Sequence, residues 1–201
     1  MKNYLCINGK KTELIKEQMK QLGILETPVA TMSADGKTVK IGKYEFIVLK
    51  KDETLGTVEL LLKGTLGDKV FGDTNNYNTS SIRQVVEEFG EEIAELVGED
   101  NLLEHTVDLV TVSGLKDYGS IKAKMSLLTF DKARENIQTL DKHNPDCWWW
   151  LATATSTKKH GIKYTVSCVE PSGCIFSLDD SRYDDGGVRP FCVLKSCIFE
   201  S

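Results

Sequence analysis

The clearest hydrophobic pattern in the chain predicts an amphipathic helix that ends at Gly98. Ser81 and Gln84 have the spacing of a capping box at its start, and Gly98 is placed to end it. Apolar side chains recur at helical spacing, at Ile82, Val85, Val86, Phe89, Ile93, Leu96 and Val97. The opposite side is acidic and is expected to be solvated, with Glu87, Glu88, Glu91, Glu92 and Glu95.

A second helix is predicted to begin after Thr129, and most of the remaining chain has a β pattern. The inward positions of this helix are Phe130, Ala133, Ile137 and Leu140. Runs rich in Val, Ile, Leu, Tyr and Phe predict strands within 38–64, 102–112, 125–129 and 147–199. Two helices that lie apart from a hairpin-rich set of antiparallel strands indicate an α+β fold rather than a doubly wound one.

The first 35 residues are predicted to form a small appendage, and residues 36–201 the main domain. Asn8-Gly9 between two short strand-like runs is a strong hairpin signal. Thr12 is a plausible N-cap for a short helix with apolar positions at Ile15, Met19 and Leu22, which Gly23 would end. Turn residues within 27–36 predict a linker.

Composition and charge narrow the classes of partner. The chain has 201 residues, which fits one domain, and a net charge of −5. Direct nucleic-acid binding is not expected, because it needs a basic face. No run approaches the length of a membrane span, and the N-terminus lacks the apolar stretch of a secretory signal. We therefore expect a cytoplasmic or virion-associated protein whose partner is a protein, a carbohydrate or a small molecule.

The sequence contains few groups arranged for catalysis or for holding a metal. G-x-S-x-G, P-loop, G-x-G-x-x-G and H-E-x-x-H motifs are absent. His105 sits in a strand pattern and is expected to be a hydrogen-bonded structural residue. The six cysteines form no C-x-x-C pair and are expected to be free thiols, although Cys168 and Cys174 flank a turn and a disulfide between them stays open. We predict no cofactor, no catalytic residue and no metal.

One acidic cluster has the composition of a cation site. Asp179, Asp180, Asp184 and Asp185 place four carboxylates within seven residues, the kind of group that binds Ca²⁺. Their spacing does not match an EF-hand loop, and Arg182 among them would neutralise part of the charge. A polar hairpin tip is the alternative interpretation.

All three tryptophans are consecutive, at Trp148, Trp149 and Trp150. In a strand, side chains alternate between the two faces, so Trp148 and Trp150 share one face and Trp149 takes the other. We therefore expect the cluster to be mainly core between two layers, with one indole near the rim.

The late motifs resemble an uncharacterised domain family that is abundant in Gram-positive gut bacteria and their phages. The resemblance rests most specifically on "WWWLAT" (148–153) and "GGVRPFCVL" (186–194), with "INGKKTEL", "IGKYEFIVL", "NNYNTSSIRQ" and "SLLT" in the family's usual order. This pair of motifs is in turn similar to the C-type-lectin-like fold of formylglycine-generating enzymes and of the variable proteins of diversity-generating retroelements. The copper-binding cysteine pair of those enzymes has no match here, and neither does the calcium motif of true C-type lectins.

The resemblance implies a scaffold that displays a variable polar surface between the Trp strand and the GVRP strand, roughly Thr153 to Asp185. The binding residues predicted on it are Thr153, Thr155, Lys158, His160, Tyr164, Asp179, Asp180, Arg182, Tyr183 and Asp184. Trp148 and Trp150 are predicted to be structural. So is Arg189, whose guanidinium has five donors for the carbonyls of a closing turn.

Three functions follow as hypotheses. The leading one is a non-enzymatic binding module, of phage or mobile-element origin, for a protein or a carbohydrate. The first alternative is an inhibitor of a host nuclease or immune complex that acts through acidic surfaces. The second is a cysteine- or metal-dependent enzyme related to the formylglycine-generating enzymes.

Overall fold

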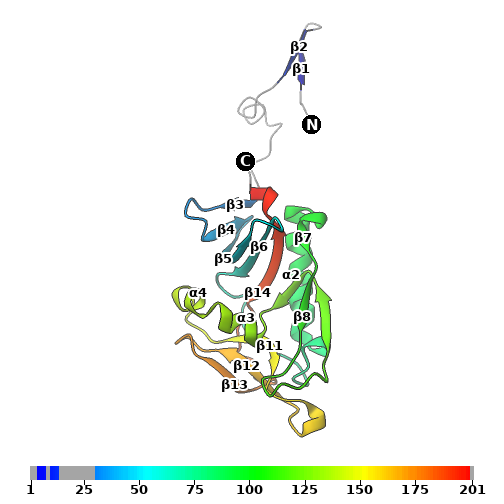
Figure 1. The fold of residues 1–201 in the computed structure, drawn as a ribbon, viewed down its shortest axis with the longest axis vertical. Helices are drawn as coiled ribbons and strands as arrows, with labels where there is room; N and C mark the ends of the chain where they lie inside the picture. Colours follow the sequence, from blue (N-terminus) through cyan, green and yellow to red (C-terminus); the bar gives the residue numbers. More distant parts are fainter. Residues whose placement is uncertain (1–3, 8–9, 14–29, 200–201) are drawn as a thin grey trace.

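The computed structural model describes residues 4–7, 10–13 and 30–199 (Figure 1). Near the N-terminus, β1 (Tyr4–Ile7) pairs antiparallel with β2 (Lys10–Glu13), which is the hairpin that the sequence predicts. The apolar positions predicted to form the next helix lie outside the described residues.

The largest unit is a seven-stranded antiparallel sheet in the order β10-β14-β6-β5-β4-β3, with β7 also paired to β14. Strand β14, from the end of the chain, lies inside the sheet between β6 on one side and β10 and β7 on the other. The seven strands are β3 (Ala30–Met32), β4 (Thr38–Ile41), β5 (Tyr44–Asp52), β6 (Thr57–Leu62), β7 (Leu102–Leu103), β10 (Met125–Leu127) and β14 (Pro190–Lys195).

Strand β3 corrects the prediction that residues 27–36 are a linker. Ala30–Met32 pair with β4 and form one edge of the large sheet. In the described part of this segment, the turn lies at residues 34–37, where Gly36 adopts a positive φ of 67°. Three residues are too short a run for alternation to stand out from a linker pattern.

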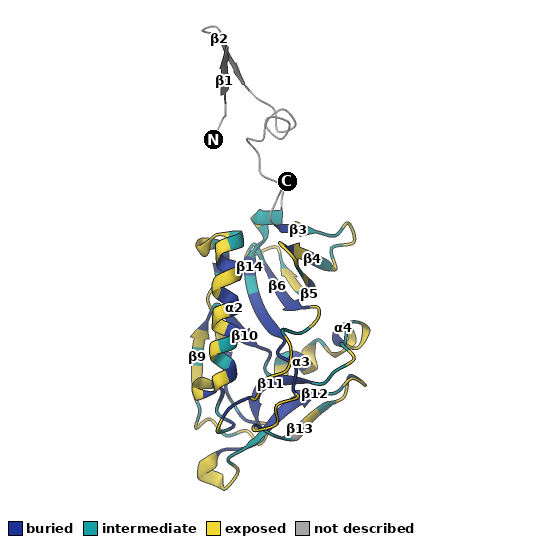
Figure 2. Ribbon diagram, turned by 180° about the vertical axis from the view of Figure 1, so that it is seen from behind, coloured by how far each residue is buried: buried dark blue, intermediate teal, exposed yellow. Residues whose placement is uncertain are grey.

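Helix α2 (Ser81–Val97) covers one face of this sheet. It buries Ile82, Val86, Phe89 and Ile93, and its five glutamates are exposed, as predicted (Figure 2). Gly90 allows the helix to approach β10 closely, because a Cβ there would lie 2.9 Å from Cβ of Met125. The predicted capping box is wrong. The N-cap is Ser80, and its hydroxyl donates instead to the carbonyl of Tyr77 in the 3-10 turn η1 (Tyr77–Thr79).

The other face of the large sheet meets two short helices and a second, three-stranded antiparallel sheet. The predicted second helix is divided into α3 (Phe130–Glu135) and α4 (Ile137–Lys142) at Asn136, whose side chain donates to the carbonyl of Lys132. Ala133 and Leu140 are buried, but Ile137 is 37% exposed, which corrects its predicted inward position. The small sheet contains β11 (Trp149–Ala154), β12 (Thr165–Val169) and β13 (Ile175–Asp180).

The remaining regular elements connect these layers. The single strand predicted over 102–112 is divided at Glu104 into β7 and β8 (His105–Asp108), and β8 pairs with β9 (Ser120–Ala123), which the sequence did not predict. Short 3-10 turns follow α2 at η2 (Glu99–Asn101), β11 at η3 (Lys158–His160) and β14 at η4 (Ser196–Phe199). The described part of the chain contains no helix that is long and apolar enough to cross a membrane. The fold class is α+β with antiparallel sheets, as predicted.

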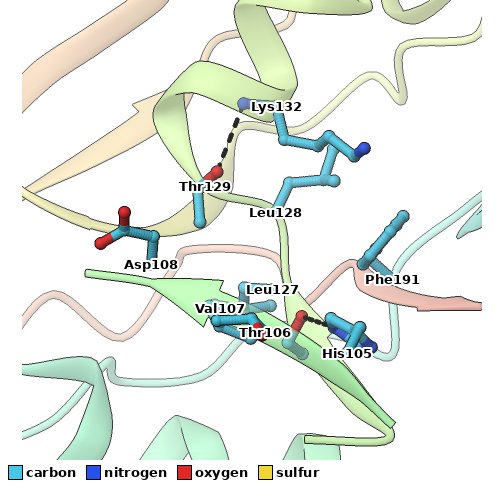
Figure 3. A pocket seen from close by; sticks show the side chains of 10 residues that line it. His105, Thr106, Val107, Asp108, Leu127, Leu128, Thr129, Lys132 and Phe191 are labelled. Carbon is cyan, nitrogen blue, oxygen red and sulfur yellow. Dashed lines mark hydrogen bonds between the residues drawn. The ribbon is translucent and has the colours of Figure 1, made fainter. Parts of the chain in front are cut away.

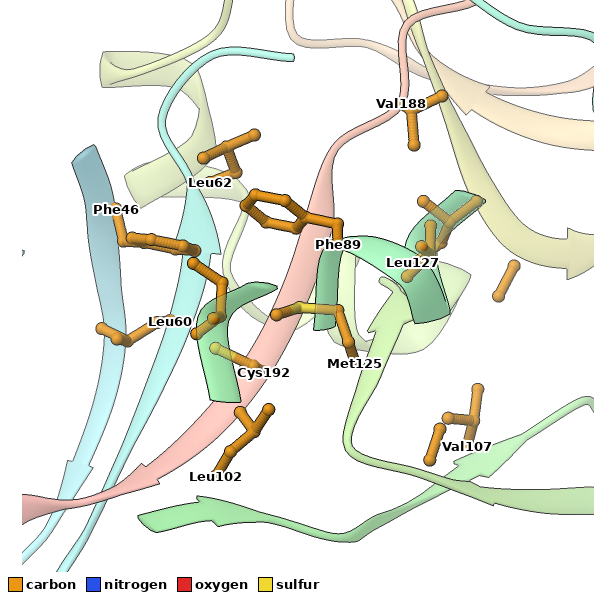
Figure 4. Close-up of a cluster of buried hydrophobic side chains, with 14 of the residues drawn as sticks. Phe46, Leu60, Leu62, Phe89, Leu102, Val107, Met125, Leu127, Val188 and Cys192 are labelled. Atoms are coloured by element: carbon orange, nitrogen blue, oxygen red, sulfur yellow. The ribbon is translucent and has the colours of Figure 1, made fainter. Parts of the chain in front are cut away.

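Two hydrophobic cores lie on the two faces of the large sheet. The larger core lies under α2 and includes Phe46, Leu60, Phe89 and Met125 (Figure 4). The smaller core lies under α3 and α4 and includes Ile47, Leu61, Leu140 and Phe191. Alternate residues of β5 and β6 therefore serve different cores, which explains why these strands are apolar on both faces.

Candidate functional site

The connection between β11 and β12 projects from the small sheet as a loop (Figure 1), and a buried asparagine lies beneath it. The Asn75 side-chain amide donates to the carbonyls of Ser156 (3.0 Å), Thr165 (3.1 Å) and Ile162 (3.4 Å). Its carbonyl oxygen accepts from the hydroxyl of Tyr118 at 2.7 Å. Both polar atoms of the Asn75 side chain are hydrogen-bonded, and they hold both ends of the loop backbone.

A second set of contacts fixes the tip of this loop. The hydroxyl of Thr157 lies 3.0 Å from Nδ1 of His160 and 3.3 Å from a carboxylate oxygen of Asp117. The same carboxylate is 3.5 Å from Nζ of Lys159, and the Tyr118 hydroxyl accepts from the amide of Lys158. The side chains of 158–160 stay exposed while their backbone is held from below.

The predicted residues at the end of β13 form a compact cluster with Tyr164. Arg182 donates from Nε and Nη2 to both carboxylate oxygens of Asp180, at 2.8 and 2.5 Å. Its guanidinium carbon lies 4.0 Å from the centre of the Tyr164 ring, an arrangement that is favourable for a cation and an aromatic face. These hydrogen bonds from Arg182 lower the pKa of Asp180. Tyr183 beside them is 53% exposed.

The structure sorts the predicted binding residues into two groups. Exposed or half-buried positions on the loop and on the segment after β13 are Thr155, Lys158, His160, Tyr164, Asp180, Arg182, Tyr183 and Asp184. The prediction for Thr153 is wrong: it is only 2% exposed, and its hydroxyl accepts from the amide of Phe130 at the start of α3. Asp179 is half-buried and its carboxylate contacts the thiol of Cys168 on β12.

The calcium hypothesis is not supported by the arrangement of the four aspartates. Asp179 turns to Cys168 and Asp180 to Arg182, so their carboxylates do not share one centre. Among the described residues, the cluster of metal-ligating groups that includes Asp179 contains none of the other three aspartates. Cys168 and Cys174 are both free, so the disulfide between them is absent.

At the start of β11, the Trp strand and the GGVRP segment lie side by side. The amide of Gly187 donates to the carbonyl of Trp148 (2.9 Å), and the amide of Trp150 donates to that of Gly187 (3.1 Å). Trp150 and Trp149 are both buried but enter different cores, and their indole N–H groups donate to the Lys69 carbonyl and the Asn144 side chain. Trp148 is half-buried, with its ring edge-on to Trp150 at 4.6 Å between centroids.

Arg189 is fully buried directly after these contacts. Its Nε donates to the carbonyl of Leu62 (2.7 Å), and its Nη2 donates to the carbonyls of Lys63 (3.1 Å) and His143 (2.9 Å). The guanidinium carbon lies 4.9 Å from the centre of the Trp149 ring. Burial lowers the pKa of Arg189 to about 10, so the side chain remains charged near neutral pH. It joins β6, β14 and the end of α4.

A separate cavity of about 180 Å³ lies between β8, β10 and α3 and contains His105 (Figure 3). Nε2 of His105 lies 2.9 Å from the hydroxyl of Ser126, and Phe191 packs edge-on against the imidazole. Ser126 is buried on β10, so its hydroxyl is covered by the imidazole and is poorly placed to attack a substrate. The pair is better described as a hydrogen bond that closes one wall of the cavity.

His105 is expected to make stability depend on pH. Burial lowers the pKa of His105 from 6.5 to about 4. Between pH 6.5 and pH 4, His105 is therefore protonated in the unfolded chain but neutral in the folded chain. Stability is therefore highest above pH 6.5 and falls as the pH decreases, by about 2 kcal/mol at pH 4.5. Urea unfolding at pH 7 and pH 4.5 measures this difference. His105→Gln should remove that part of the pH dependence, and an unchanged dependence in this variant would contradict the assignment.

Sequence reasoning missed the residues that organise the loop. Asn75 and Tyr118 lie in polar segments whose partners are more than 30 residues away, so no local pattern marks them. Comparisons with known proteins found no matching family model, curated protein or solved structure.

Proposed function

We propose that this chain is a non-enzymatic binding module with a C-type-lectin-like arrangement, which recognises a protein through one surface. This loop surface consists of residues 155–164 and 180–184. The observation that carries the proposal is the support under it: Asn75 and Tyr118 hold the loop backbone from below while the side chains at the tip remain exposed. A backbone ordered before binding lowers the entropy cost of association.

The composition of the loop surface favours a protein partner. It combines an exposed tyrosine, a tyrosine stacked on Arg182 and exposed polar side chains at 158–160, and tyrosine and arginine are residue types that recognition surfaces favour. The hydrogen bonds between the Trp strand and the GGVRP segment support the proposed scaffold, which displays its variable surface between these two motifs.

Site-specific photo-crosslinking tests this proposal. A photoreactive residue at position 159 or 183 should capture the same partner from a Gram-positive host lysate. The same residue at position 55 should not, because Leu55 is 73% exposed but lies in the β5–β6 turn, outside the loop surface. Equal capture at all three positions would contradict the proposal.

The Asn75→Ala variant adds a second readout on the same surface. Without its hydrogen bonds the loop loses about 1–3 kcal/mol of local stability, so capture at position 159 should fall about tenfold. Hydrogen exchange of residues 156–165 should rise in parallel. The matched control is Asn101→Ala, which removes a hydrogen bond to the Val97 carbonyl at the end of α2 and should leave capture unchanged.

The acidic face of α2 supports the inhibitor hypothesis as a second candidate. Its five glutamates are exposed, but Glu87 is paired with Arg83 and Glu92 with Lys43, so the unpaired charge is smaller than the sequence suggests. A partner bound through this face would dissociate steeply as salt rises. It would also be lost on substitution of Glu88, Glu91 and Glu95 by glutamine, which leaves the loop surface intact.

A further inference from the structure

Three side chains that bind metals converge between β12 and β13. Cys168 and Glu170 are two residues apart on the β12 side, so they project to the same face. The Asp179 carboxylate reaches them from β13 and contacts the Cys168 thiol. The donor atoms of the three groups all lie within 4.8 Å of one another.

A β-bulge brings Asp179 to this face. Val166 pairs with Asp179 and Cys168 pairs with Phe176, so between these pairs β13 has one residue more than β12. Without the bulge, regular alternation would turn Asp179 to the opposite face of the sheet. Bulges of this kind redirect a side chain and are common beside functional sites.

The cluster is rich in negative groups and lacks a compensating cation. Cys168 is fully buried, and Glu170 and Asp179 are half-buried. Among the described residues, no lysine, arginine or histidine forms an ion pair with either carboxylate. By contrast, the half-buried carboxylates of Asp52, Glu59 and Asp180 each pair with a lysine or an arginine. Burial raises the pKa of the Cys168 thiol, and the two nearby carboxylates raise it further. A divalent cation would remove this unfavourable accumulation of charge.

We propose that Cys168, Glu170 and Asp179 form a zinc site. One thiolate and two carboxylates are a three-ligand set that leaves a fourth tetrahedral position for water. The mixture of sulfur and oxygen favours Zn²⁺ over Ca²⁺ or Mg²⁺, which prefer six or more oxygens. Tetrahedral ligands at zinc bond lengths lie about 3.3–3.8 Å apart. The Cys168 sulfur and the Asp179 carboxylate, which are in hydrogen-bond contact, therefore separate when the ion binds, and all three donors start within 4.8 Å of one another. Binding replaces the thiol proton, which leaves to solvent as the sulfur–zinc bond forms.

Titration with Co²⁺ tests the site directly, because a cobalt–thiolate bond gives a charge-transfer absorption that carboxylates alone do not. The purified protein should bind one Co²⁺ and show this absorption, and the absorption should disappear when Zn²⁺ is added. Cys168→Ser should abolish the band. Cys174→Ser, an exposed free thiol at the turn of the same hairpin, should leave it unchanged. Zn²⁺ should also raise the melting temperature of the parent and of Cys174→Ser, but not of Cys168→Ser.

Asp179→Asn keeps the test decisive if loss of Cys168 disturbs folding. This variant has nearly the same shape, and we expect it to weaken Co²⁺ binding at least tenfold while the circular dichroism spectrum without metal is unchanged. Absence of a charge-transfer band in the parent, or a band that survives in Cys168→Ser, would overturn the proposal. The cluster would then contain only the hydrogen bond between the Cys168 thiol and the Asp179 carboxylate, and no metal site.

Discussion

Replacing Arg189 by alanine should lower the free energy of unfolding by about 3–4 kcal/mol, among the largest effects of any single substitution in this chain. The substitution leaves the buried carbonyl of Leu62 and the partly buried carbonyls of Lys63 and His143 without their donor. It also removes the cation above the Trp149 ring and opens a cavity in the smaller core. Urea unfolding followed by circular dichroism measures the change.

Two further variants separate these contributions. Arg189→Met keeps most of the side-chain volume and removes the buried charge, so it should cost less than alanine, about 2 kcal/mol. Arg182→Ala is the matched control, because Arg182 is exposed and its contacts with Asp180 and the Tyr164 ring lie at the surface; it should leave the free energy of unfolding nearly unchanged. If Arg189→Ala behaves like Arg182→Ala, the structural role of Arg189 is wrong.

The regular elements were predictable wherever one face of an element is buried and the other is not. Helix α2 shows this best, since its apolar and acidic sides alternate with the helical period and both lie where expected. The failures are local. Asn136 interrupts the second helix, with its side chain hydrogen-bonded to the Lys132 carbonyl. Ser80 takes the N-cap position, and its hydroxyl donates to the Tyr77 carbonyl instead of capping the helix. Hydrophobic periodicity reveals neither of these side-chain hydrogen bonds.

The candidate site was only partly predictable, because its organisation depends on long-range contacts. The exposed positions at 158–160 and 182–184 were predicted from the polarity of the segment that the family resemblance marks as a variable surface. Thr153 has the same polarity, yet it lies inside the small sheet, where its hydroxyl holds the start of α3. Asn75 and the thiol–carboxylate cluster at Cys168 need the pairing of strands and a bulge, which a single sequence does not reveal.

Gly186 is the first of the two glycines before Val188, and replacing it should be the second substitution with a large effect on stability. Its φ is not in the left-handed region, so the requirement for glycine is space. A Cβ at this position would lie 2.6 Å from Cη2 of Trp148 and closer still to the indole nitrogen of Trp150. The carbonyl of Gly186 accepts from the amide of Lys69, and the carbonyl of Lys69 accepts from Trp150, so backbone and indole are both held in place.

Gly186→Ala should therefore cost about 3 kcal/mol, because neither the backbone nor the buried indole has room to move. The matched control is Gly64→Ala, where a Cβ would have no heavy atom within 4 Å and φ is not positive. That variant should be neutral or slightly stabilising, by up to about 0.5 kcal/mol, since alanine restricts the unfolded chain. Urea unfolding gives both values, and tryptophan emission at low urea should shift to longer wavelength only in Gly186→Ala. Equal stability of the two variants would show that the Trp strand and the GGVRP segment do not pack as tightly as this contact requires. The contact between Gly186 and the two tryptophans would then not explain why a glycine is needed at this position.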